Sequence, residues 1–168
     1  RCSALIKTTD ENILIDTSPD LRQQLLRHKI KKINKVLFSH MHGDQTHGVN
    51  DLRSFYINSG KQINVYADNH TSKYLKNSFS YIFKSYSNEY PATLKLNKLP
   101  KNINIKNKDK KIKIQSVIVK HGKVKSNCFI VDRKLAYISD VNKIYEKDFK
   151  FFKNLKYLII DCLWYNFH

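Results

Sequence analysis

A cluster of metal-binding residue types directly follows a strand-like apolar run, and it restricts the fold more than any other part of the chain. The run is Val36–Phe38, and the cluster contains His40, His42 and Asp44. Because these three residues lie two apart, an extended loop would turn their side chains the same way. The carboxyl end of a buried strand is where α/β sheets bind their ligands. We therefore expect an α/β domain with a site at this strand end.

Imidazole and carboxylate groups together suit zinc, manganese or iron, and three protein ligands leave a position open for water. A metal ion lowers the pKa of such a water and makes it a nucleophile near neutral pH. The alternative interpretation is a polar strand-to-helix loop that happens to contain histidines. The histidine positions favour the metal site, because His40, His42 and His47 lie within eight residues and His121 precedes a glycine at the end of a later strand-like segment.

Hydrophobic periodicity predicts alternating strands and helices around this cluster. A helix is expected from Ser18-Pro19-Asp20, where Ser18 would cap it, to about His28. A hairpin is expected around Asp132-Arg133. The segment 85–111 is rich in lysine and the least regular. Strands are expected at 3–8, 12–16, 36–38, 63–66, 112–119, 128–131, 135–138 and 157–160, and further helices at about 46–57, 71–84 and 146–153. This order predicts an α/β layered domain with helices on at least one face of a sheet.

Composition limits the alternatives. With 168 residues, 41% of them apolar, the chain fits a single domain, 1–168, with its own core. No apolar run approaches the roughly 20 residues of a membrane-spanning helix, and the short apolar runs are typical of buried strands. The chain begins at Arg1 and ends at His168, directly after an apolar segment. We therefore expect a chain that is truncated at both ends.

The net charge of +17 could attract nucleic acid, an anionic membrane surface or a phosphorylated substrate. Lysines are spread along the whole chain, which indicates a general compositional bias rather than a binding patch. Nucleic acid therefore stays a possible partner, and no membrane partner is expected. The three cysteines form no Cys-x-x-Cys pair, and Cys128 and Cys162 lie in apolar runs that suggest inert core thiols. A reducing cytoplasm is the expected location.

The sequence His40-x-His42-x-Asp44, between an apolar strand and a helix, resembles the signature of the metallo-β-lactamase superfamily. Three further motifs follow the order of that superfamily: a strand that ends at Asp16, the pair His121-Gly122, and a strand that ends at Asp140. The segments 47–53 and 161–165 resemble the subfamily that contains the cyclic phosphodiesterases of bacterial phosphonate breakdown.

The resemblance implies an αββα sandwich with its metal site at one edge, between two sheets. His40, His42 and His121 would hold the first metal ion, Asp44 would hold a second, and Asp140 would bridge the two. Asp44 or Asp140 would also orient the attacking water or accept its proton. Asp16 would orient a ligand from outside the metal shell. The expected cofactor is one or two divalent ions, zinc in the first place, with manganese or iron as alternatives.

Two positions depart from the superfamily pattern. Gln45 stands where the motif normally has a histidine, and His47 lies two residues further along, on the expected helix. Relatives also supply a last histidine after the strand that here ends at Asp161, and His168 is a candidate for it. The favoured function is hydrolysis of small or cyclic phosphodiesters. The alternatives are an RNA-processing nuclease of the same superfamily and a degenerate protein that binds metal or ligand without catalysis.

Overall fold

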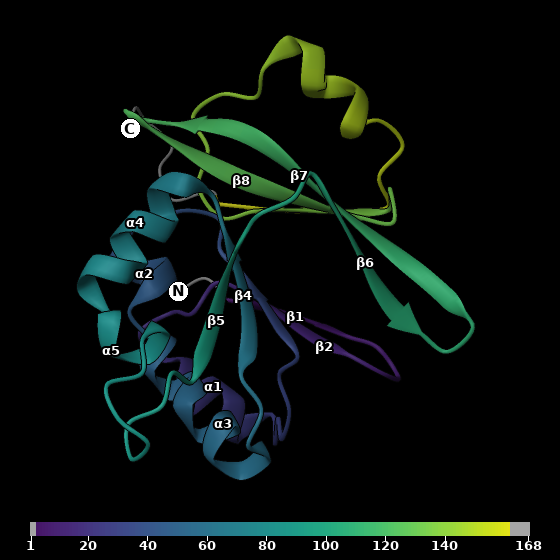
Figure 1. Cartoon of the computed structure of the whole chain (residues 1–168). Helices are drawn as coiled ribbons and strands as arrows, with labels where there is room; N and C mark the ends of the chain where they lie inside the picture. Colours follow the sequence, from purple (N-terminus) through teal and green to yellow (C-terminus); the bar gives the residue numbers. More distant parts are fainter. Residues whose placement is uncertain (1–2, 162–168) are drawn as a thin grey trace. The chain divides into compact units, whose positions relative to one another are not determined.

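The computed structural model describes residues 3–161. The chain divides into two compact units, Arg1–Leu99 and Pro100–His168, and each contains one five-stranded sheet (Figure 1). In the described part of the chain, none of the helices combines the length and the apolar character needed to cross a bilayer.

The sheet of the first unit is mainly parallel. Its strand order is β1-β2-β3-β4-β5, in which β1 pairs antiparallel with β2 and the other neighbours are parallel. The carboxyl ends of β2 and β3 reach the same edge, because Ile15 pairs with Leu37. This register brings the segments that follow the two strands close together. The strands are β1 (Ala4–Lys7), β2 (Asn12–Ile15), β3 (Lys35–Leu37), β4 (Ile63–Ala67) and β5 (Leu94–Lys98).

The helices of the first unit lie along one face of its sheet (Figure 1). Their apolar residues, such as Leu21 and Leu75, join the same buried cluster as Val36 and Val65 from the central strands. The helical elements are α1 (Leu21–Arg27), α2 (Gly43–Thr46), the 3-10 turn η1 (Val49–Leu52), α3 (Arg53–Ser59), α4 (Asn69–Ser78) and α5 (Ser80–Phe83). Burial of this cluster is the main force that holds the helices on the sheet.

Two expected helices are interrupted. The helix predicted at 46–57 is divided among α2, η1 and α3, because the N–H of Gly48 donates to the carbonyl of Thr17, 2.9 Å away, instead of continuing the helix. The helix predicted at 71–84 is divided into α4 and α5 at Phe79, where φ is −133° and ψ is 36°. In both cases tertiary contacts or local backbone geometry override the helical period of the sequence.

The expected serine cap of the first helix is wrong. Asp20 occupies the N-cap position of α1, and no side chain caps the helix there. The hydroxyl of Ser18 instead donates to Oδ1 of Asp20 at 2.8 Å, and the carbonyl of Ser18 accepts from the N–H of Leu21 at 2.9 Å.

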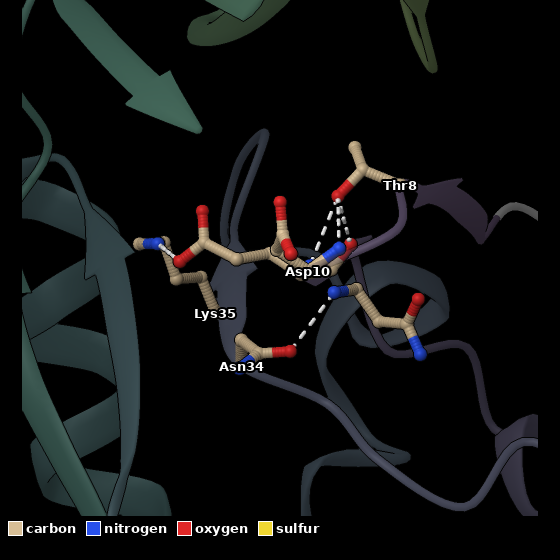
Figure 2. A network of polar contacts seen from close by, with 6 residues as sticks. Thr8, Asp10, Asn34 and Lys35 are labelled. Atoms are coloured by element: carbon tan, nitrogen blue, oxygen red, sulfur yellow. Dashed lines mark hydrogen bonds and ion pairs between the residues drawn. The ribbon is translucent and has the colours of Figure 1, made fainter. Parts of the chain in front are cut away.

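The turn between β1 and β2 is tied to the segment that leads into β3 (Figure 2). Oγ1 of Thr8 accepts the N–H of Glu11 at 2.9 Å, which closes the turn. Oδ1 of Asn34 accepts the N–H of Asn12 at 2.9 Å, and Lys35 forms an ion pair with Glu11. These contacts fix the start of β2 against the start of β3.

The sheet of the second unit is mainly antiparallel, with the order β10-β9-β8-β7-β6. Because β7 and β9 both run antiparallel to β8, they share one direction and end at the same edge. A buried cluster that includes Val119, Cys128 and Ile138 packs against Phe151 and Leu155 in and after the 3-10 helix η2. The elements are β6 (Asn102–Asn107), β7 (Lys110–His121), β8 (Val124–Val131), β9 (Leu135–Ile138), η2 (Glu146–Phe151) and β10 (Tyr157–Ile160).

Several predictions for residues 85–161 are confirmed, and three are wrong. The hairpin is present, with positive φ angles of 51° at Asp132 and 55° at Arg133. The segment 85–111 is more regular than expected, because it contains β5 and β6. The segment 146–153 forms a 3-10 helix rather than an α-helix. The strand β10 is present but not buried, and its side chains are 42% to 66% exposed. Cys128 is buried as expected, whereas Cys162 lies outside the described residues.

Candidate metal centre

Asp16 links the ends of two parallel strands in the first unit. It follows β2, is fully buried, and has a left-handed φ of 58°, which aspartate tolerates better than most residues. Its Oδ1 accepts the N–H of Ser39 at 2.7 Å, and its Oδ2 accepts the hydroxyl of Ser39 at 2.7 Å. Ser39 follows β3, so one carboxylate fixes the start of the histidine loop.

The contact of Ser39 with His40 selects the tautomer of that histidine. Oγ of Ser39 lies 3.1 Å from Nδ1 of His40. Since the hydroxyl proton of Ser39 points to the Asp16 carboxylate, which only accepts, Oγ is left to accept the proton on Nδ1 of His40. A neutral His40 then carries its lone pair on Nε2. Hydrogen bonds of this kind fix the orientation of histidines that bind metals.

The lone pair of His40 faces His42. Nε2 of His40 lies 3.0 Å from Nδ1 of His42, and the two rings are nearly perpendicular, at 74°. Zinc–nitrogen bonds in a tetrahedral site place two ligand nitrogens about 3.3 Å apart. The two imidazoles therefore fit a shared divalent ion, and His40, at 1% exposure, provides a rigid side of the site.

Thr17 holds the far end of the histidine loop. Its N–H donates to the carbonyl of Gln45 at 2.6 Å, and its hydroxyl lies 3.1 Å from the carbonyl of Thr46. The hydroxyl of Thr46 donates in turn to the carbonyl of His42 at 2.9 Å. The loop is thus anchored at both ends by the segment that follows β2.

Asp44 and Gln45 form a pair in α2. The carboxylate of Asp44 is exposed, whereas Gln45 is fully buried. Nε2 of Gln45 donates to Oδ2 of Asp44 at 2.8 Å.

His47 takes part in a different contact. Its Nε2 lies 3.0 Å from the hydroxyl of Tyr74 in α4. The same ring fills the space beside Gly43, where a Cβ would approach it to 2.8 Å. These contacts indicate a structural role for His47, which supports the histidine loop from outside.

In the second unit, His121 and Asp140 lie at one edge of the sheet. His121 is the last residue of β7 and Asp140 follows β9, and both are half-buried. The segment after Asp140 is bonded to the segment around His121, since the N–H of Asn142 donates to the carbonyl of Lys120 at 2.7 Å. The side chain of Asn142 also accepts the N–H of Gly122.

The structure thus brings together His40, His42 and Asp44 in one loop, and His121 and Asp140 at one sheet edge. His168 lies outside the described residues. The sequence interpretation missed Ser39 and Tyr74. A hydroxyl residue directly before His40 was the available signal for Ser39, whereas the contact of Tyr74 depends on the packing of α4 and has no local signal.

The comparisons with known proteins concern the family and the fold of the chain. The family described as the beta-lactamase superfamily domain matches residues 11–167. A solved diphosphatase of the PhnP family is 28% identical, with a TM-score of 0.79 over 94% of this chain and 58% of that one. The zinc-bound PqqB of Methylobacterium extorquens is 15% identical, with a TM-score of 0.70 over 96% of this chain and 60% of that one. The short form of human tRNase Z is 17% identical, with a TM-score of 0.62 over 93% and 69%.

A curated relative, the octanoyltransferase of Porphyromonas gingivalis, is 29% identical over 98% of this chain but only 33% of its own length. Because two thirds of that protein lie outside the match, its name assigns no activity to the matched third. This chain spans about three fifths of the PhnP-family diphosphatase and a third of the octanoyltransferase. The metallo-β-lactamase fold implied by the sequence is confirmed, and the chain belongs to the beta-lactamase superfamily domain family.

Proposed function

We propose that this chain is a metal-dependent hydrolase that acts on small phosphodiesters, cyclic ones included. The observation that carries the proposal is the hydrogen-bonded series Asp16–Ser39–His40, which turns the lone pair of His40 towards His42, 3.0 Å away. Similarity to a PhnP-family diphosphatase supports a phosphate-containing substrate.

In the proposed site, His40, His42 and His121 hold a divalent metal ion, zinc in the first place, and Asp140 is a further ligand. Such an ion makes water acidic near neutral pH and stabilises negative charge on phosphate oxygens. Asp44 is exposed, so its carboxylate is suited to orient the water and accept its proton. The buried Asp16 and Ser39 keep His40 in its binding tautomer throughout.

Hydrolysis of bis(p-nitrophenyl) phosphate and of a nucleoside cyclic phosphate, with added zinc or manganese, tests this function. We expect turnover that is lost in His42→Ala and retained in His28→Ala. His28 is a matched control, since it is an exposed histidine at the end of α1. Activity that survives in His42→Ala, or no turnover with either metal, would contradict the proposal. An octanoyl thioester in the same panel tests acyl hydrolysis, to which the name of the Porphyromonas relative points.

The net charge of +17 favours a second candidate, an RNA-processing nuclease. Contacts with many phosphates make affinity fall steeply with salt. Cleavage of RNA with such a salt dependence would support the nuclease, whereas salt-insensitive turnover of small diesters would support the first candidate. Binding of metal without any turnover would instead support a non-catalytic protein.

A further inference from the structure

Gln45 is held rigidly beside the proposed metal ligands. Its side chain is fully buried, and its carbonyl accepts the N–H of Thr17 at 2.6 Å. Its own N–H donates to the carbonyl of His42 at 3.1 Å. Because both backbone groups are bonded, the direction in which the side chain leaves the loop is fixed.

The amide of Gln45 presents hydrogen atoms, not lone pairs, to Asp44. Nε2 of Gln45 donates to Oδ2 of Asp44 at 2.8 Å, and a carboxylate oxygen accepts such a bond. The group that faces the carboxylate must therefore be the NH₂ of the amide. An NH₂ group does not ligate metal ions, and its hydrogen bond occupies one oxygen of Asp44.

The arrangement of His40 and His42 is the opposite, because two ring nitrogens that can carry lone pairs face each other at 3.0 Å. His40 and His42 thus offer a place for a cation. The carboxylate of Asp44, next in the loop, already accepts a hydrogen bond from Gln45. A cation at Asp44 would have to compete with that donor and would gain no nitrogen ligand from residue 45.

We infer that the chain holds a single metal ion tightly, because Gln45 supplies no ligand for a second ion and its amide engages Asp44. The inference rests on the proposed metal site at His40 and His42. In this arrangement Gln45 is a positioning residue, which orients the Asp44 carboxylate next to the ion instead of binding an ion itself.

The test is the zinc content per chain, measured by elemental mass spectrometry after dialysis, together with a cobalt titration followed by absorbance. We expect one equivalent in the wild type. Gln45→His adds a nitrogen ligand and should bind a second equivalent at least about tenfold more tightly than the wild type does. Gln45→Leu, which removes the donor without adding a ligand, should stay at one tight equivalent.

Gln24→His is the matched control. Nε2 of Gln24 also donates to a carboxylate, Oδ1 of Asp20 at 3.0 Å, but this pair lies in and next to α1 and is not part of the histidine loop. Its metal content should equal that of the wild type. Gln45→Glu, which is close in shape to glutamine, replaces the histidine variant if the latter does not fold.

Two tight equivalents in the wild type, or a single equivalent in whichever of Gln45→His and Gln45→Glu is measured, would overturn the inference and leave the proposed function intact. No bound metal in the wild type and in both variants would overturn the metal site itself, and the inference with it.

Discussion

The two units hold their histidines in different ways. In the first unit, His40 is buried, follows a central parallel strand, and is oriented through Ser39 by the fully buried Asp16. In the second unit, His121 is half-buried and ends a strand at a tight hairpin, where Gly122 has a left-handed φ of 55°. The first unit thus holds His40 in its core, whereas the position of His121 in the second unit depends on the conformation of one turn.

The largest expected loss of stability comes from a substitution at Gly48, where the first unit is tightly packed. A Cβ at Gly48 would lie 2.0 Å from the backbone oxygen of Ser18, which cannot move without displacing the segment that follows β2. Gly48→Ala should therefore lower the free energy of unfolding by about 3 kcal/mol or more. Urea denaturation of the wild type and of Gly48→Ala measures this difference in the free energy of unfolding. In the control Gly60→Ala, the Cβ meets nothing within 4 Å. Equal losses in the two variants would show that Gly48 is not a packing constraint.

The second largest effect is expected when the carboxylate of Asp16, which orients His40 through Ser39, is removed. Asp16→Ala leaves the buried N–H and hydroxyl of Ser39 without their carboxylate, and the free energy of unfolding should fall by about 2–4 kcal/mol. Zinc affinity should fall by about 10- to 100-fold. Asp16→Asn keeps one acceptor oxygen and tolerates a left-handed φ, so its losses should be smaller. Unchanged zinc affinity in Asp16→Ala would refute the orienting role.

A third substitution tests whether the turn at Gly122 holds His121 in place in the second unit. Gly122→Ala places a Cβ in open space, 3.9 Å from Oδ1 of Asn142, so its cost should come from the left-handed φ alone, about 1–2 kcal/mol. Gly60→Ala, at a φ of 64°, should cost as much in urea denaturation. Only Gly122→Ala should also weaken zinc binding, because the turn holds His121. Equal zinc affinity in both variants would place His121 outside the metal site.

The smallest effect concerns pH and the core of the second unit. Burial raises the pKa of the Cys128 thiol from 9.0 to about 12. Above pH 9 the unfolded chain loses this proton while the folded chain keeps it, so folding stability falls as pH rises from about 9 to 12. Between pH 8 and pH 10 the wild type should lose about 1.4 kcal/mol more than Cys128→Ala. Parallel pH profiles in urea denaturation would show that the thiol is not buried in solution.

The sequence predicted most strands and the grouping of the site residues by strand ends. Val36–Phe38 and the segment ending at Asp16 carry an apolar pattern that does not depend on distant contacts. The break at Gly48 was not predictable, because it depends on hydrogen bonding to Thr17, 31 residues earlier. The role of Ser39 was missed for a similar reason, since it needs the parallel pairing of β2 with β3.

The long strand β7 carries exposed lysines near its first end and His121 at its last. Its first end meets β6 at a turn rich in exposed lysines, among them Lys108, Lys110 and Lys111, and its last residue is His121. Twelve extended residues span roughly 35–40 Å. The Debye length in physiological salt is about 8 Å, so these ammonium groups are almost completely screened at His121. These lysines would leave the capture of a small diester at His121 nearly unchanged. A polyanion long enough to follow β7 would interact with the lysines and with His121 at the same time.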